Sequence, residues 1–183
     1  MSSLRTSLFI VGLLALGLPQ AQAQTRVRGT ITAADGNSIT VDNKTQVQLG
    51  GKTEIVFAQP IELSQIKPGD FLGVTSLRAA DGSLRAIEVR RFPKPVNPGH
   101  RPFDGRDDQT MTNAAVGAMV QSANGRELTM TYEGGAQKIV VPQGASVSTL
   151  VPGRREQLVV GAPVNLTHDP GGVALRIQVG PKR

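Results

Sequence analysis

The sequence predicts an all-β protein built as two tandem small β-barrels of the OB-like kind, joined by a proline-rich linker. Short segments alternate apolar and polar side chains with a period of two, which is typical of half-buried strands. Glycine-containing turn signals separate these segments, and no stretch sustains the period of an amphipathic helix. The order of strands and turns then recurs along the chain, which predicts a duplicated small domain.

Residues 1–23 have the pattern of an export signal. Arg5 supplies a positive charge, the run from Leu8 to Leu18 is apolar, and Ala21-Gln22-Ala23 has the small residues of a cleavage site. The apolar run is shorter than the roughly 20 residues that span a bilayer. We therefore predict Sec-dependent export, cleavage after Ala23 and a periplasmic protein. A retained N-terminal anchor is the alternative.

Residues 24–91 are predicted to form the first barrel repeat. Val27, Gly29 and Ile31 alternate with polar residues, and the following Asp35-Gly36-Asn37 accepts the positive φ angles of a hairpin turn. The later segments are strands at 38–42, 45–49 and 54–57, one helical turn at 61–66, and strands at 71–77 and 84–91. Several short strands in such a span predict a small closed or nearly closed barrel, because closure removes exposed sheet edges.

Residues 115–183 are predicted to form the second barrel repeat. The matching positions include Gly29 with Gly117, Ile39 with Leu128, and Ile87 with Ile177. Any β-rich sequence aligns partly with itself, so that alternative explanation of the match stays open. A domain this small buries only about 60% of its unfolded surface, which predicts that the two repeats lean on each other.

The first strand of the second repeat is apolar on both faces. Val116, Ala118 and Val120 lie on one face, and the residues between them are also apolar or small. One face suits the core of its own repeat. The other face is therefore predicted to contact the first repeat or a partner chain.

Residues 92–114 are predicted to be a linker without regular structure. Prolines recur through its first part, at positions 93, 95, 98 and 102. Such a path is extended or polyproline-like and loses little entropy when it is fixed. The linker also contains aromatic and charged residues that a plain spacer does not need.

Four linker residues are predicted to bind a partner, namely His100, Arg101, Phe103 and Asp104. Arginine forms forked hydrogen bonds to a carboxylate or phosphate, and phenylalanine supplies an apolar anchor of the kind found at interface centres. The histidine would make the contact sensitive to pH. The alternative is structural: Phe103 fills the seam between the barrels, and Arg101 pairs with Asp104.

Several classes of chemistry lack the residues that they require. The chain has no cysteine, which excludes disulfides, thiolate catalysis and cysteine-ligated metal sites. It has no G-x-S-x-G elbow, phosphate loop or dinucleotide fingerprint, so we expect neither an enzyme nor a cofactor. Few aromatic residues are available for base stacking, so nucleic acid is not an expected partner. After the signal, no apolar run reaches the length of a transmembrane span.

Metal binding has few candidate ligands after the signal. They are His100, His168, Met111, Met119 and Met130, of which the last two follow the strand pattern and are expected in the core. His100 and Met111 alone do not make a closed site. No resident metal is therefore predicted.

The formal net charge of +6 suits an anionic partner. We expect a periplasmic, non-enzymatic binding or scaffolding protein of the cell envelope. Its expected partner is an envelope protein or an anionic envelope component, of unknown identity. The alternative function is a metal-handling accessory protein, for copper or zinc, that uses His100 and nearby linker residues.

The motifs of this chain resemble those of a known family. The first repeat reads G-x-I-x-x-A-D-G-N-x-I-x-V from Gly29, then K-P-G-D from Lys67 and D-G-x-L-x-A-I-E-V from Asp81. With the linker segments 99–104 and 110–114, this pattern resembles an uncharacterised family of exported proteobacterial proteins that contain two small β-barrel repeats. Some members carry a metal ABC transporter permease label. The resemblance implies a periplasmic address and no established activity.

A looser similarity is to periplasmic copper chaperones with an OB barrel. Their sites use histidine, methionine and a tryptophan that lies over the cuprous ion. This chain has no tryptophan, and residues 27–91 contain neither histidine nor methionine. Copper binding therefore does not carry over from this similarity.

Overall fold

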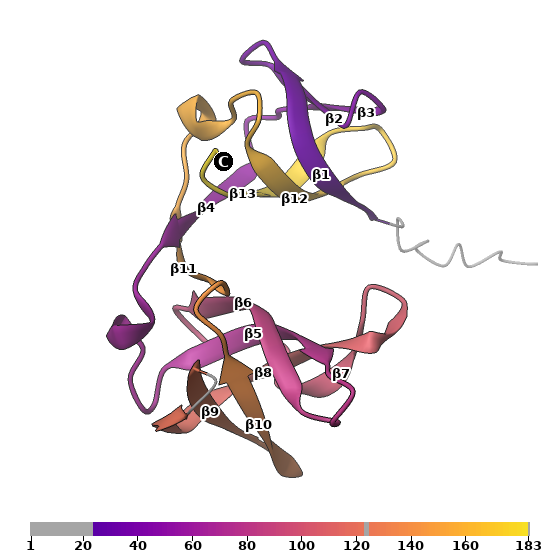
Figure 1. The fold of residues 1–183 in the computed structure, drawn as a ribbon. Helices are drawn as coiled ribbons and strands as arrows, with labels where there is room; N and C mark the ends of the chain where they lie inside the picture. Colours follow the sequence, from indigo (N-terminus) through magenta and orange to yellow (C-terminus); the bar gives the residue numbers. More distant parts are fainter. Residues whose placement is uncertain (1–23, 123–124, 183) are drawn as a thin grey trace, which may run out of the picture.

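A computed structural model describes residues 24–122 and 125–182 of the protein (Figure 1). Within these residues the regular structure is β-strand apart from two short 3-10 helices, which confirms the predicted all-β class. In this part of the chain no helix has the length and apolar character needed to cross a membrane. The predicted export signal lies outside the described residues.

The first six strands lie where the sequence pattern predicts strands. They are β1 (Thr25–Ala34), β2 (Ser38–Val41), β3 (Thr45–Gln48), β4 (Glu54–Pro60), β5 (Phe71–Arg78) and β6 (Leu84–Phe92). The others are β7 (Gly99–Phe103), β8 (Arg106–Ser122), β9 (Gly125–Tyr132), β10 (Gly135–Val141), β11 (Ser146–Pro152), β12 (Pro163–His168) and β13 (Ala174–Val179). The 3-10 helices η1 (Leu63–Gln65) and η2 (Arg155–Gln157) follow β4 and β11.

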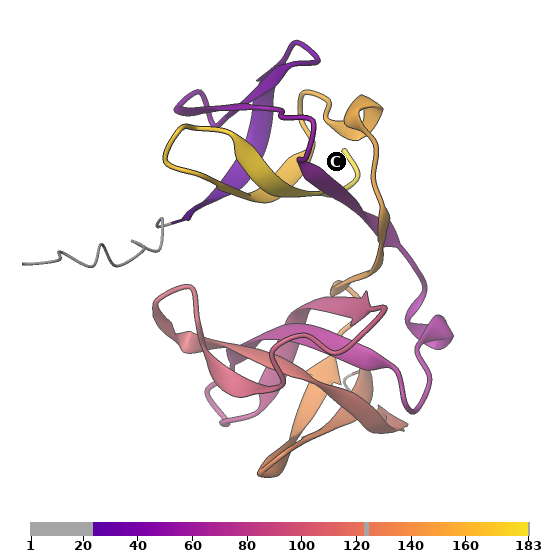
Figure 2. The same cartoon turned by 180° about the vertical axis from the view of Figure 1, so that it is seen from behind.

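All strands belong to one sheet, in the order β10-β9-β8-β5-β6-β11-β4-β13-β12-β1-β2-β3, with β7 paired to β8. Figures 1 and 2 show that the sheet curls into two lobes that face each other across a gap. We call β1, β2, β3, β12 and β13 the terminal lobe, and β5 to β10 the central lobe. Strands β4 and β11 pair antiparallel and join the lobes, and we call them the connecting pair.

Each lobe has its own hydrophobic core, and each core draws on both predicted repeats. The buried residues of the terminal lobe lie within 31–49 and 158–179. Those of the central lobe lie within 66–89 and 114–141. The packed units therefore do not follow the predicted boundaries of the repeats.

Strand pairing explains this division. Strand β1 pairs antiparallel with β12, and β8 pairs antiparallel with β5. The chain between 24 and 91 consequently begins in the terminal lobe and ends in the central lobe, and the chain between 115 and 183 does the reverse. The central lobe is thus a continuous stretch of chain inserted between two separate parts of the terminal lobe.

The same local arrangement occurs in both lobes. Ile31 exchanges two backbone hydrogen bonds with residues 161–162, at 2.8 and 2.9 Å, and Val116 exchanges two with residues 69–70, at 2.8 and 2.9 Å. A β-bulge follows Ile31 and another follows Val116. By its hydrogen bonds, Val116 is the counterpart of Ile31.

The predicted linker contains strands, so the expectation of no regular structure in residues 92–114 is wrong. Strand β7 pairs antiparallel with the first part of β8. Pro102 is tolerated because β7 is an edge strand, with β8 as its partner among the described residues, and edge strands are where proline occurs in sheets. The two turn residues, Asp104 and Gly105, have φ of 57° and 66°, as the favoured two-residue hairpin turn requires.

Candidate functional site: a groove between the lobes

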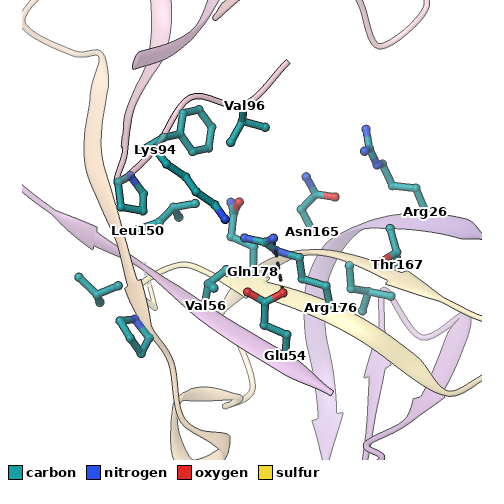
Figure 3. A pocket seen from close by; sticks show the side chains of 15 residues that line it. Arg26, Glu54, Val56, Lys94, Val96, Leu150, Asn165, Thr167, Arg176 and Gln178 are labelled. Carbon is teal, nitrogen blue, oxygen red and sulfur yellow. Dashed lines mark ion pairs between the residues drawn. The ribbon is translucent and has the colours of Figure 1, made fainter. Parts of the chain in front are cut away.

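A groove lies between the two lobes. It consists of two adjoining pockets of about 620 and 420 Å³, whose linings share Asn165 and Gln178. Figure 3 shows the larger pocket, in which Lys94 reaches from the segment after β6 toward Arg176 and Gln178. We call the two pockets together the groove.

The terminal wall of the groove carries two rows of side chains that cross β1, β12, β13 and β4. Residues paired on adjacent strands point to the same face of a sheet. One row is Arg26, Thr167, Arg176 and Glu54, and the next is Arg28, Asn165, Gln178 and Val56. Alternate residues of β12 and β13, such as Leu166 and Ile177, lie in the core of the terminal lobe. Because these alternate residues pack in the core, the largely polar residues between them face the groove.

The central wall of the groove is partly covered by the segment that follows β6. Gly73 makes room for Phe92, because a Cβ on Gly73 would lie only 2.5 Å from Phe92 Cε2. Asn113 Nδ2 donates hydrogen bonds to the carbonyl oxygens of Val96 and Asn97, at 2.9 and 3.2 Å. This segment is therefore held over the central wall, and it gives the groove an apolar side.

Positive charge predominates in the groove. The cationic residues in its lining are Arg26, Arg28, Arg90, Lys94 and Arg176. Two carboxylates share the lining: Glu54 pairs with Arg176 at 3.5 Å, and Glu88 pairs with Arg90. Among the described residues of the lining, the remaining cations leave an excess of positive charge.

Arg90 is held in a partly desolvated place on the central wall. Its side chain is 16% exposed, and burial lowers the pKa of its guanidinium, with the Glu88 carboxylate opposing the shift and nearby Arg28 adding to it. Among the described residues, Arg90 Nε has no hydrogen-bond partner. The same holds for the Oγ of Ser148, which is the register partner of Arg90 on β11. The two buried atoms without a partner thus belong to paired residues that both line the smaller pocket.

Two of the four residues predicted to bind a partner meet the other lobe. Asp104 pairs with Arg28 of β1, and the guanidinium carbon of Arg28 lies 5.2 Å from the centre of the Phe103 ring. The tip of the β7–β8 hairpin therefore touches the terminal lobe on the side away from the connecting pair (Figure 1). We call this contact of Arg28, Phe103 and Asp104 the hairpin contact.

The other two predicted residues, His100 and Arg101, lie elsewhere. Arg101 Nη1 donates to the carbonyl oxygen of Asn97 at 3.1 Å. The Arg101–Asp104 pair expected in the structural alternative is therefore wrong, because Asp104 pairs with Arg28 instead. His100 Nδ1 lies 2.8 Å from Thr112 Oγ1, and partial burial lowers the pKa of His100, with a further contribution from Arg78.

A closed metal site requires several ligand side chains that lie close together. Within residues 24–122 and 125–182, no three side chains of histidine, cysteine, aspartate or glutamate are grouped so that they could hold a metal ion. His100 has the Thr112 hydroxyl beside its Nδ1. Of the two alternatives for His100, the metal-handling one therefore gains no support from geometry.

Sequence reasoning did not single out the cations of the terminal wall. Arg26 and Arg28 occupy alternate positions of β1, and Arg176 and Gln178 do so on β13. This alternation was the available signal, because it marks one polar face on each strand. The sequence did not indicate that the first and last strands of the chain belong to the same wall.

Comparison with known proteins gives one family match. Residues 28–90 are similar to DUF5666, a domain of unknown function. This agrees with the expected likeness to an uncharacterised family at the level of a domain of unknown function. No curated protein and no solved structure matches the chain significantly. The DUF5666 match runs from β1 to β6, so it spans parts of both lobes.

Proposed function

We propose that the protein is a non-enzymatic binding protein of the cell envelope, exported to the periplasm, and that its groove holds an extended acidic polypeptide segment. We further propose that the chain is a tandem duplication whose two copies have exchanged their second halves. The observation that carries the proposed function is the double row of arginine and amide side chains on the terminal wall.

The cations of the groove support an anionic ligand. Arg26 and Lys94 are exposed and form no ion pair with any described residue. Unpaired charges of one sign in a concave site raise the local concentration of oppositely charged ligands and speed their association. An acidic segment would therefore be drawn to the groove, and its affinity would fall as the salt concentration rises.

The neutral residues of the groove support a polypeptide. Asn165 and Gln178 each offer a donor and an acceptor, which match the N–H and C=O groups of an extended chain. Phe92 and Val96 offer apolar contacts on the central side of the groove, and Leu150 offers one from the connecting pair. An acidic segment that also carries apolar side chains satisfies both sides of the groove.

Binding of a labelled peptide of alternating glutamate and valine to the mature chain, residues 24–183, tests this function. The double variant Arg26→Gln/Lys94→Gln removes the two unpaired cations, and we expect about a tenfold weaker affinity, or roughly 1.4 kcal/mol. Fluorescence anisotropy at low and high salt measures it. The matched control, Lys44→Gln/Lys52→Gln, removes the same charge from turns of the terminal lobe and should keep the affinity.

Two outcomes would contradict the proposal. An equal loss in both double variants would mean that the peptide responds to net charge and not to the groove. Binding of lipopolysaccharide but not of the peptide would assign the groove to another class of ligand.

The proposed periplasmic location has its own test. N-terminal sequencing of the exported protein should find Gln24 as the first residue, and a retained Met1 would refute cleavage.

A further inference from the structure

The smaller pocket of the groove has a feature that the larger one lacks among the described residues. Arg90 on β6 and Ser148 on β11 are register partners in a parallel pair, and both line this pocket of about 420 Å³. Register partners share one face of a sheet, so the guanidinium and the hydroxyl project together. Arg28 lines the same pocket from β1, on the terminal wall.

The polar atoms at this place lack the partners that buried groups normally have. Arg90 Nε and Ser148 Oγ are both buried without a hydrogen-bond partner among the described residues, and Ser148 as a whole is only 5% exposed. Most buried polar side chains in folded proteins find a partner, because leaving a donor unsatisfied is costly. Both residues line the smaller pocket, so a group bound there would approach both side chains.

The charges around these atoms define the group that fits. Glu88 accepts a hydrogen bond from Arg90 Nη2, and the Nε–H of the same guanidinium has no acceptor among the described residues. Asp104 pairs with Nη1 of Arg28, which leaves the other N–H groups of that guanidinium. A ligand between the two arginines therefore meets donors from both walls, and it must present acceptor oxygens.

We infer that Arg90, Ser148 and Arg28 form a binding site for one oxyanion group, a carboxylate or a phosphate. This inference rests on the proposed function, in which the site receives an acidic side chain of the bound segment. Arginine suits this role because its planar fork of donors matches the oxygens of such groups. Ser148 adds a hydroxyl donor from the neighbouring strand.

Titration of the mature protein with inorganic phosphate, and separately with acetate, tests the site. In NMR spectra of ¹⁵N-labelled protein, we expect a saturable shift of the Arg90 Nε–Hε signal, because that proton gains an acceptor. Ser148→Ala removes the neighbouring hydroxyl and should weaken phosphate binding about tenfold. Ser64→Ala is the matched control, because Ser64 is exposed on η1 outside the smaller pocket, and it should bind as the parent does.

Arg90→Lys keeps the charge and removes the Nε donor, so we expect it to lose phosphate binding. If this variant fails to fold, Ser148→Ala still decides the question. A shift that chloride reproduces at matched ionic strength would reduce the effect to screening and overturn the inference. An unchanged Arg90 signal with both anions would also overturn it, since water would then be the only occupant.

The two proposals fail separately. Phosphate or acetate binding that depends on Ser148, without binding of the acidic peptide, would leave the oxyanion site standing and remove the proposed function. Peptide binding that phosphate does not compete with, and that Ser148→Ala leaves unchanged, would do the opposite. Stronger competition by acetate than by phosphate would identify a carboxylate as the natural group.

Discussion

The terminal and central lobes share a pattern of hydrogen bonds but expose their groove walls differently. In the central lobe, Asn113 and Gly73 hold the segment after β6 against the wall. The corresponding places on the terminal wall carry Arg28 and Asn165, which line the groove. The same framework thus has two outcomes, because one wall is covered by a segment of the chain itself and the other lines the groove, where we propose that the ligand binds.

The central lobe is one continuous stretch of chain, whereas the terminal lobe is built from two separate stretches. This difference gives the largest expected effect, which is on the unfolding of fragments. A fragment of residues 24–95 contains only part of each core, so we expect no cooperative unfolding transition. A fragment of residues 61–152 contains every buried member of the central core and should unfold cooperatively. Circular dichroism during heating measures both. If 24–95 melted as high as the mature chain, the division of the lobes described above would be refuted.

The packing of Phe92 against the central wall should depend on the absence of a side chain at Gly73. In Gly73→Val, the added Cβ would lie 2.5 Å from Phe92 Cε2 and 2.9 Å from Asn113 Oδ1. We expect a loss of about 1–3 kcal/mol in the free energy of unfolding, because such crowding forces neighbours to move. Gly51→Ala is the control in the terminal lobe, since a Cβ there meets nothing within 4 Å. Urea denaturation compares the two, and equal stabilities would contradict close packing at Gly73.

The hairpin contact between the lobes should contribute less. Phe103→Ala removes the ring beside the Arg28 guanidinium, and we expect a loss of about 1 kcal/mol. Arg101→Ala is the control from the same hairpin, because its guanidinium donates to the carbonyl oxygen of Asn97 in the same lobe, and it should melt close to the parent. Thermal unfolding measures both variants. A larger loss from Arg101→Ala would show that the wrong residue has been assigned to the lobe junction.

The smallest effect concerns His100 of the central lobe. Partial burial and Arg78 lower its pKa below the usual value of 6.5 in the folded state, so the unfolded chain binds the proton more readily. The contribution of His100 to stability is therefore complete above pH 6.5 and is lost as the pH falls through the folded-state pKa. His100→Gln should flatten this part of the curve of melting temperature against pH. A parent curve that rises on acidification in that window would contradict the direction.

The sequence predicted the elements better than it predicted their partners. The alternation around Ile31, Ile39 and Val41 placed buried residues correctly, because local pattern decides which side chains face a core. Pairing between strands far apart in the chain has no such local signal. The sequence alignment of Gly29 with Gly117 also differs from the structural correspondence, because the backbone hydrogen bonds make Val116 the counterpart of Ile31.

The linker shows why a rule can fail at one position. Proline was expected to exclude strands, but Pro102 lies on β7, which is an edge strand among the described residues, where proline is tolerated. The Asp104-Gly105 pair has the residue types of a two-residue hairpin turn, and both residues adopt its positive φ angles. The groove was missed for a different reason. Its cations come from the first strand, from β6 and the segment after it, and from the last strand, so no motif contains them.

Insertion of the central lobe into the terminal lobe sets the order in which the protein can be completed during synthesis. Strand β1 is made early, but its partner β12 and the rest of the core arrive only near the end of the chain. Contacts of such long sequence separation form slowly, and a strand without its partner is open to aggregation. Arg26 and Arg28 place positive charge on β1 while it lacks its partner β12. Charged side chains on an unpaired strand discourage pairing with another chain. The arginines assigned to the ligand would thus also protect the newly made polypeptide.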